Sequence, residues 1–408
     1  MQRALANPGL ISLAAGFVDP ATLPVEATAH TAAALLADAV EGRRALQYGT
    51  TFGDLLLRER LVGLLEEGEG APSGSFSELV PRTVVTTGSQ QLLYLVAEAL
   101  LDPGDIVLVE SPTYFVYLGI LETQGACPVG VAIDSGGLRL DALEATLQQL
   151  ETEGRLNRVK LIYTVSEHSN PTGLSLAADR RGPLVELAQR WSKHQHILVL
   201  EDAAYRGLTF TGFEPPSVWS HDPGGQTVLL ARSFSKTFSP GLKTGFGVLP
   251  DALVLPVLKL KGNHDFGSSN FNQQLLERVL ASGQYEPQVQ RLASAYLRKR
   301  DVFLEALDDH FGPLAAEGSV SWTRPDGGLY VWLTLPEGID SGVDGALFSR
   351  CVEEGVLYVP GAYAFANEPG PVPTNHARLT FGVASEAGLV EGARRLAKAL
   401  DACLDPVG

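Results

Sequence analysis

The chain has 408 residues, of which 45% are hydrophobic, and this favours a soluble protein of two domains with a large core. Its formal net charge of −16 at pH 7 argues against a basic face that would bind nucleic acid or an anionic membrane. Its three cysteines are far apart and lack metal-ligand spacing, so we expect no metal site and a reducing compartment. No apolar run approaches the roughly 20 residues of a membrane helix, and no signal-peptide pattern opens the chain, so a cytoplasmic location is the expectation.

The first 40 residues are predicted to form an arm and a helix. A short apolar segment covers residues 10–14, and an alanine-rich helix is expected over 27–40. A break follows at residues 42–49, and an amphipathic helix is expected over 54–66. We expect the arm to pack with a smaller C-terminal domain.

From residue 82, short apolar runs alternate with helical patterns. The predicted strands cover residues 83–86, 106–110, 128–133, 159–164, 197–200, 228–231 and 246–249. Helices are expected over 89–101, from 112 onward, over 140–153 and over 177–194. This alternation predicts an α/β domain with a mostly parallel, seven-stranded sheet between helices. Ligands bind such sheets at the carboxyl ends of the strands.

The pattern changes after residue 249. Helices are expected over 271–281, 285–311, 345–354 and 386–404, and strands over 320–323, 329–335, 356–359 and 378–381. This mixture predicts a smaller α+β domain. We therefore divide the chain into an arm (1–40), a large domain (41–265) and a small domain (266–408).

One lysine lies on a loop between two predicted strands. Ser233 and Ser235 come before Lys236, and a second cation, Lys243, follows. A lysine amine in a partly desolvated pocket can attack a carbonyl, and serines with a nearby cation suit a phosphate. The alternative is an ordinary solvated lysine.

Residues after two further predicted strands are candidates for binding a ligand, and each also has a purely structural interpretation. Gly88, Ser89 and Gln90 open a helix directly after a strand, which is either an anion site or a plain helix start. Asn170 belongs to a turn sequence, and its amide could also donate to a ligand oxygen.

Asp202 follows an apolar strand, where a buried carboxylate needs a partner. The partner could be Arg206, a backbone cap or the ring nitrogen of a bound heterocycle. Tyr205, three places on, could face the same pocket. The ring of Tyr114 could belong to the core or stack on a flat ligand.

Arg378 lies in a predicted strand of the small domain. Its guanidinium could clamp a carboxylate or form a structural salt bridge. Taken together, the candidates comprise phosphate donors, a ring stacker, a carboxylate for a ring nitrogen, a lysine nucleophile and a carboxylate clamp. This set describes pyridoxal phosphate held as a Schiff base.

A series of motifs, in order along nearly the whole chain, carries a family resemblance. The motifs are LQYGTTFGDLLLRERL, TTGSQQ, ESPTY, SNPTG, EDAAYR, SFSKTFSPGLK, TRPDGGLYVWLTLP, VLYVPGAYAFAN and RLTFGVAS. With them the chain resembles the class I/II, fold-type I pyridoxal-phosphate aminotransferases, and it is most similar to the 2-aminoadipate and kynurenine type.

The resemblance implies roles for the residues that match these motifs. Lys236 would hold the cofactor and move the substrate proton, and Asp202 would pair with the pyridine nitrogen. Asn170 and Tyr205 would bond the phenolic oxygen of the cofactor, and Tyr114 would stack on its ring.

The same resemblance places the phosphate and the substrate. The phosphate is assigned to Ser89, Gln90, Ser233, Ser235 and Lys243. Tyr48 would reach the phosphate of a neighbouring subunit, which implies a homodimer. Arg378 would grip the substrate carboxylate, with Asn170 and the backbone near Gly16 also at the substrate.

The sequence departs from the family pattern in three places. Lys243 stands where the family has an arginine. A lysine keeps the positive charge but lacks the planar guanidinium that can form two parallel hydrogen bonds. Ser169 replaces the usual glutamine, and Glu167 and His168 precede it. The N-terminal segment is shorter than the usual arm, so the family does not define the substrate side chain.

The implied activity is a ping-pong transfer of an amino group from an L-amino acid to a 2-oxo acid, with 2-oxoglutarate favoured on family grounds. One alternative is a β-lyase or decarboxylase on the same scaffold. Another is a non-catalytic effector domain of a transcriptional regulator.

Overall fold

The structure is a computed structural model, and it describes residues 9–366 and 370–404. The first eight residues of the predicted arm, residues 405–408 of the predicted small domain and Asn367 of the motif VLYVPGAYAFAN lie outside the described residues.

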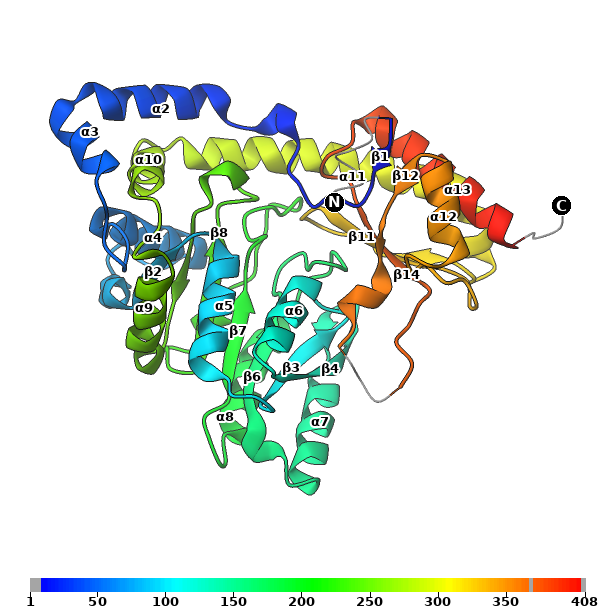
Figure 1. The fold of residues 1–408 in the computed structure, drawn as a ribbon, viewed down its shortest axis with the longest axis horizontal. Coiled ribbons are helices and arrows are strands. Elements are labelled where there is room, and N and C mark those ends of the chain that lie inside the picture. The colour runs from blue at the N-terminus through cyan, green and yellow to red at the C-terminus, as the bar shows by residue number, and fades with distance from the viewer. Residues whose placement is uncertain (1–8, 367–369, 405–408) are drawn as a thin grey trace.

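A central sheet organises the large domain (Figure 1). Its strands are β2 (Thr83–Thr86), β3 (Ile106–Ser111), β4 (Cys127–Asp134), β5 (Gly137–Leu138), β6 (Val159–Thr164), β7 (Leu198–Asp202), β8 (Val228–Ser233) and β9 (Gly245–Val248). The eight strands lie in the order β2-β9-β8-β7-β6-β3-β4-β5. Neighbours from β8 to β4 run parallel, whereas β9 is antiparallel to both β2 and β8. The expected seven strands are present, and β5 adds a short antiparallel hairpin to β4.

Helices cover both faces of this sheet. They are α4 (Leu55–Glu69), α5 (Ser89–Leu100), α6 (Phe115–Thr123), α7 (Leu140–Thr152), α8 (Ala178–Trp191) and α9 (Asp251–Asp265). Successive strand residues point to opposite faces, so Leu229 joins the core of one face and Leu230 that of the other. Leu161 and Ile162 divide in the same way. Because both faces are buried, the strands read as continuous apolar runs.

Two α-helices of the described residues were not predicted from the sequence. The helix α9 contains Pro256 and Gly262, which weaken its helical pattern. The short helix α3 (Ala39–Leu46) occupies part of the predicted break, and the Asp38 side chain caps it by accepting from Val40 and Glu41 N–H. Tyr114 was expected inside a helix but is the residue before α6.

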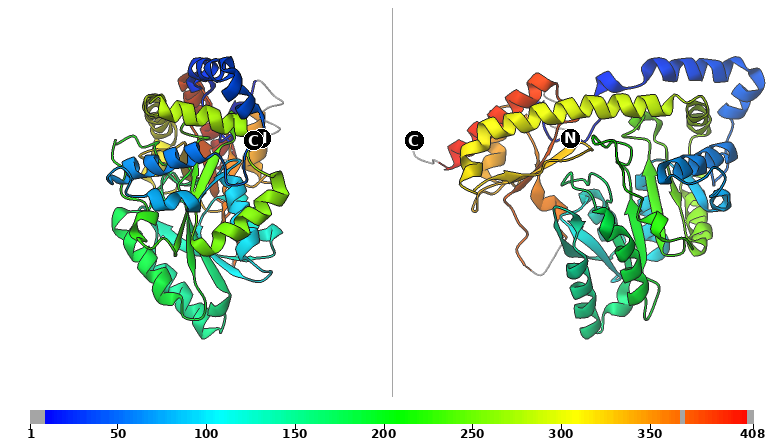
Figure 2. Two further views of the ribbon diagram at one scale, coloured as in Figure 1. Left: turned by 90° about the vertical axis from the view of Figure 1, so that its left-hand side faces the viewer. Right: turned by 180° about the vertical axis from the view of Figure 1, so that it is seen from behind.

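The small domain contains a four-stranded antiparallel sheet in the order β10-β11-β14-β13. Its strands are β10 (Ser321–Trp322), β11 (Tyr330–Thr334), β13 (Val359–Pro360) and β14 (His376–Thr380). Helix α10 (Asn270–Ala281) leads into the helices of this half, which are α11 (Tyr285–Ala316), α12 (Ala346–Glu353) and α13 (Glu386–Leu404). The 32-residue helix α11 runs from the large domain to the small one (Figure 2).

The N-terminal segment contacts both halves of the molecule. Strand β1 (Ile11–Ser12) pairs in parallel with β12 (Val356–Leu357), and α2 (Val25–Ala37) packs on α10. Because α10 also packs against α4, we propose that the domain boundary lies near the start of α11 rather than at residue 266.

No helix among the described residues combines the length and the apolar character needed to cross a membrane.

Candidate active site

A cavity of about 180 Å³ lies at the carboxyl ends of β7 and β8. It brings together the predicted residues Ser89, Gln90, Tyr114, Asn170, Asp202, Tyr205, Ser233, Ser235, Lys236 and Lys243. They come from strand ends, loops and helix starts spread over about 150 positions of sequence. Parallel strands deliver them to one edge of the sheet, as the strand–helix alternation predicts.

One end of the cavity is the N-terminus of α5. Gly88 has a φ of 77°, which turns the chain from β2 into the helix at Ser89. A Cβ on Gly245 of the neighbouring strand would lie 2.6 Å from the Ser89 nitrogen, so only glycine leaves room there. Free N–H groups at a helix start, with the Ser233 and Ser235 hydroxyls and Lys243, can hold a phosphate.

A buried lysine that was not predicted supports this helix start from behind. Lys261 donates to Asp265 Oδ2 at 2.9 Å, to Ser268 Oγ at 2.9 Å and to Gln91 Oε1 at 3.1 Å. Gln91 Oε1 in turn accepts from the Thr87 N–H at 2.8 Å. The network therefore fixes the residue that precedes Gly88.

Asp202 is the last residue of β7 and is buried. Its Oδ2 accepts from the Tyr163 hydroxyl at 2.9 Å, and its Oδ1 accepts from the Ala204 N–H at 3.2 Å. Burial raises the pKa of Asp202 to about 6. Of the partners considered from the sequence, the backbone cap is present, whereas Arg206 binds other carboxylates.

Lys236 reaches across the cavity to the N-terminal segment. Its Nζ donates to the Gly16 carbonyl at 2.6 Å. A Cβ on Gly16 would lie 2.4 Å from the Tyr330 hydroxyl, so a side chain at position 16 would push this segment away. Tyr205 donates to Tyr330 Oη at 3.2 Å, which gathers two phenols beside the lysine.

Tyr330 is a second residue that sequence reasoning missed. Burial would raise the pKa of Tyr330, but the positive charges of Arg378 and Lys236 outweigh it, so the pKa is lowered. Both Tyr330 and Tyr163 lie inside strands predicted from apolar runs, and nothing local distinguished their hydroxyls from core aromatics.

Arg378 is buried and faces the same region from β14. Its guanidinium donates to Asn170 Oδ1 at 2.9 Å and to the Ala14 carbonyl at 2.6 Å, and it lies 4.6 Å from the Tyr330 ring centroid. Its buried Nε has no hydrogen-bond partner among the described residues. Arg378 forms no salt bridge with a carboxylate among the described residues. The geometry therefore favours a role in binding an incoming carboxylate.

Tyr48 does not line the cavity of its own chain. Its side chain is 82% exposed, and its ring contacts the edge of Phe266 at 5.7 Å between centroids.

Glu167 and Arg206, near the site residues in sequence, belong to a buried ionic network. Glu167 Oε1 accepts from Arg181 at 2.8 Å and from Arg206 at 2.9 Å. Burial would raise the pKa of Glu167, but Arg206 and Arg181 outweigh it and hold the pKa at about 2. Arg206 also pairs with Glu69 at 3.1 Å.

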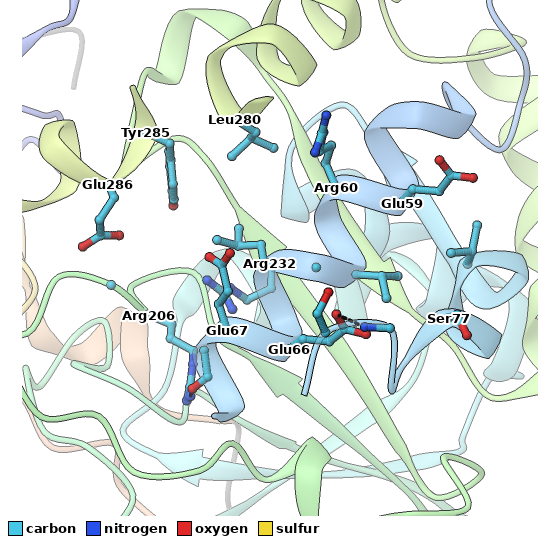
Figure 3. A pocket seen from close by; sticks show the side chains of 18 of the residues that line it. Glu59, Arg60, Glu66, Glu67, Ser77, Arg206, Arg232, Leu280, Tyr285 and Glu286 are labelled. Atoms are coloured by element: carbon cyan, nitrogen blue, oxygen red, sulfur yellow. Dashed lines mark hydrogen bonds between the residues drawn. The ribbon is translucent and has the colours of Figure 1, made fainter. Parts of the chain in front are cut away.

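A larger cavity of about 1200 Å³ lies elsewhere, between α4, the end of α10 and the start of α11 (Figure 3). It contains none of the predicted site residues. Size alone therefore does not select a candidate site, and the smaller cavity is the candidate because it gathers a lysine, a carboxylate and a helix start.

Known proteins that are similar to this chain are aminotransferases. The model of the family "Aminotransferase class I and II" matches residues 8–396. The chain is 32% identical over 391 residues to Aromatic-amino-acid aminotransferase 1 of Thermococcus litoralis, covering 96% of this chain and 88% of that protein. It is 32% identical over 403 residues to 2-aminoadipate transaminase of Thermus thermophilus, covering 98% and 92%.

Solved structures show the same fold. Kynurenine aminotransferase of Pyrococcus horikoshii, solved in complex with PMP and with KYN as substrates and KYA as products, aligns with a TM-score of 0.89. The alignment has 31% identity and covers 99% of this chain and 93% of that one.

The chain thus belongs to the class I and II aminotransferase family and has the fold-type I architecture. It is an aminotransferase, similar to the aminoadipate, kynurenine and aromatic types, and moves an amino group from an amino acid to a 2-oxo acid.

Proposed function

We propose that the 180 Å³ cavity binds pyridoxal 5′-phosphate on Lys236 and that 2-oxoglutarate is the amino acceptor. The observation that carries the proposal is that Lys236 and Asp202 line one small cavity that ends at the N-terminus of α5. An amine, a buried carboxylate and a helix start match the aldehyde, the ring nitrogen and the phosphate of this cofactor.

When bound, the cofactor withdraws electrons from the bonds at the substrate α-carbon. Asp202 provides a fixed negative charge for the ring nitrogen, and Tyr163 and Ala204 N–H hold its carboxylate in place. Asn170 and Tyr205 both line the cavity, where they can donate to an oxygen on the ring, and Tyr114 can cover one ring face.

Lys236 is placed to act as the base. Its Nζ reaches the Gly16 carbonyl at the substrate side of the cavity, so it can take up the proton released from the substrate α-carbon. The adjacent Tyr205 and Tyr330 hydroxyls give this amine polar neighbours in a buried region.

Arg378 is placed to bind the substrate carboxylate. Asn170 Oδ1 and the Ala14 carbonyl now accept from two of its nitrogens, and its unpartnered Nε offers another donor. A carboxylate can replace these neutral acceptors with charge-assisted bonds, so binding of substrate is favoured over the resting contacts.

We further propose a homodimer in which Tyr48 reaches the partner's cofactor phosphate. The exposed apolar side chains near Tyr48 support such an interface; they are Leu46, Leu55, Leu56 and Phe266. The free cysteines Cys127, Cys351 and Cys403 are compatible with the cytoplasmic location that we propose.

The half-reaction tests the function. Purified protein loaded with pyridoxal phosphate is mixed with single L-amino acids, without oxo acid, and the absorbance of the cofactor is followed. Conversion to the amine form of the cofactor, reversed by 2-oxoglutarate, is the expected result. Release of carbon dioxide or ammonia without formation of that amine form would instead establish a decarboxylase or lyase.

A further inference from the structure

The 1200 Å³ cavity lies behind the loops that carry the active-site residues. Its walls come from α4, the 3-10 helix Ser77–Arg82, the segment 206–214, Arg232 and the start of α11. In Figure 3, Arg232 lies near the centre of the drawn side chains, and Glu59 and Glu286 lie toward opposite edges.

The two cavities share strand and loop segments. Ser233 lines the smaller cavity and its neighbour Arg232 the larger one, because successive residues of β8 point to opposite faces. After β7, Tyr205 lines the smaller cavity and Arg206 the larger one. A ligand in the larger cavity would therefore contact the reverse side of the active-site loops.

One hydrogen bond connects the larger cavity directly to the Lys236 loop. The Tyr285 hydroxyl, on a cavity-lining residue, donates to Thr237 Oγ1 at 2.8 Å. The same ring meets Phe234 edge-on at 5.4 Å between centroids. Lys236 lies between these two contact residues.

The inner polar groups of the larger cavity are engaged, with one exception. Glu66 accepts from the Gly74 and Phe76 N–H groups at 2.9 and 2.7 Å, and Glu214 accepts from the Gly207 N–H at 2.5 Å. The half-buried Arg232 side chain makes no hydrogen bond or ion pair with any residue in the described ranges. A guanidinium in this position has five donors available for an anion.

Carboxylates outnumber cations at the rim of the cavity. Glu59, Glu67 and Glu286 line the rim and are exposed, whereas the exposed arginine there, Arg60, pairs with Glu277 at 3.4 Å. These carboxylates repel a ligand that carries only negative charge and attract an ammonium group.

We propose that this cavity binds a zwitterionic amino carboxylate, with its carboxylate on Arg232 and its ammonium group facing the rim carboxylates. Amino acids belong to this chemical class, so the site would allow an amino acid to bind behind the active-site loops as well as within the active site. The proposal does not depend on the cofactor assignment, and its failure would leave the proposed function unchanged.

Three probes separate the two charges of the ligand. They are 6-aminohexanoate, which has both charges and no α-amino group, hexanoate, which lacks the ammonium, and hexylamine, which lacks the carboxylate. Each is titrated by calorimetry into protein loaded with pyridoxal phosphate and reduced with borohydride, so that the active site cannot react. We expect saturable binding of 6-aminohexanoate and at least about 10-fold weaker binding of each single-charge probe.

The variant R232Q tests the carboxylate contact. We expect it to weaken 6-aminohexanoate binding by about 10-fold or more, with an unchanged melting temperature showing that the variant is folded. R298Q, which removes an exposed arginine on α11, is the matched control and should bind like the parent. Absent binding of 6-aminohexanoate, equal binding of hexanoate, or full binding by R232Q would each overturn the proposal.

Discussion

Glu201 and Asp202 are adjacent carboxylates at the end of β7, and they face opposite sides of the sheet. Both are buried, and burial raises both pKa values. Glu201 accepts from the Val218 and Trp219 N–H groups at 3.0 and 2.7 Å, which fixes part of the connection between β7 and β8. Asp202 instead lines a cavity that can admit a ligand.

Two arginines, Arg206 and Arg378, differ in the same way as Glu201 and Asp202. Arg206, on the Glu201 side, pairs with Glu69 and Glu167 within the protein. Arg378, on the cavity side, has neutral acceptors and an unpartnered Nε. Burial alone therefore does not mark a functional charge; an incomplete set of partners next to a cavity does.

The largest effect is expected on the cavity side, at Lys236. The variant K236A should lose turnover by on the order of 10²–10⁴-fold or more, because it removes the proposed base and cofactor link. K243A, which removes the other cavity lysine, should lose far less. Steady-state rates of the two variants compare them, and substantial transamination by K236A would contradict the assignment.

On the opposite side, a charge change should affect stability rather than chemistry. E167Q leaves Arg181 and Arg206 without their shared buried carboxylate. We expect it to lower the free energy of unfolding by about 3–5 kcal/mol, as measured by urea denaturation. A loss below about 1 kcal/mol would show that this ionic network contributes little to the stability of the fold.

Asp202 should show opposite effects on activity and on stability. D202N removes the charge proposed to face the ring nitrogen, so turnover should fall by on the order of 10²–10³-fold. A pKa raised from 3.8 to about 6 means that the cofactor-free folded chain loses stability as the pH rises through this range. The free energy of unfolding of cofactor-free D202N should therefore exceed that of the cofactor-free parent by roughly 3 kcal/mol at pH 8. This difference should disappear toward pH 4. Urea denaturation at the two pH values measures the difference, and an equal advantage at both would contradict the buried-carboxylate account.

Arg378 should act mainly on substrate binding. R378K keeps the charge but loses the planar fork, so we expect KM for the amino acid to rise by about 10- to 100-fold with a smaller change in kcat. A variant whose kcat falls while KM stays unchanged would show that Arg378 does not clamp the substrate.

The smallest effect is expected at Lys261, which supports the N-terminus of α5. K261M removes the lysine that holds Gln91 and, through it, the Thr87 N–H. Cofactor affinity, titrated into cofactor-free protein, should fall by about 5- to 10-fold. K299M removes another buried lysine, which pairs with Asp19 at 2.6 Å, and is the matched control. Equal losses in both variants would assign the effect to general destabilisation.

The elements that could be predicted from the sequence are those with strong local patterns. The runs 83–86 and 159–164 match β2 and β6 because adjacent apolar residues of each strand are buried on opposite faces of the sheet. The run 228–231 ends two residues too early, since Arg232 and Ser233 continue β8 although both are polar. Turn and strand-end residues such as Asn170 and Asp202 were candidates because ligands bind at strand ends, and both line the smaller cavity.

The remaining features depend on contacts between distant segments. Tyr163 binds Asp202, and Lys261 binds Gln91 across 170 positions, so no local pattern indicates either pair. Arg206 was a candidate partner for Asp202, but the structure turns it to Glu69 and Glu167 on the other side. Which carboxylate an arginine meets is decided by packing, not by its position in the sequence.

One measurement tests the central claim most directly: borohydride reduction of the purified protein with pyridoxal phosphate, followed by peptide mass spectrometry. The account predicts a stoichiometric cofactor adduct on Lys236 in the parent and none at that position in K236A. A colourless protein without an adduct, or an adduct placed on Lys243 or Lys261 instead, would contradict it.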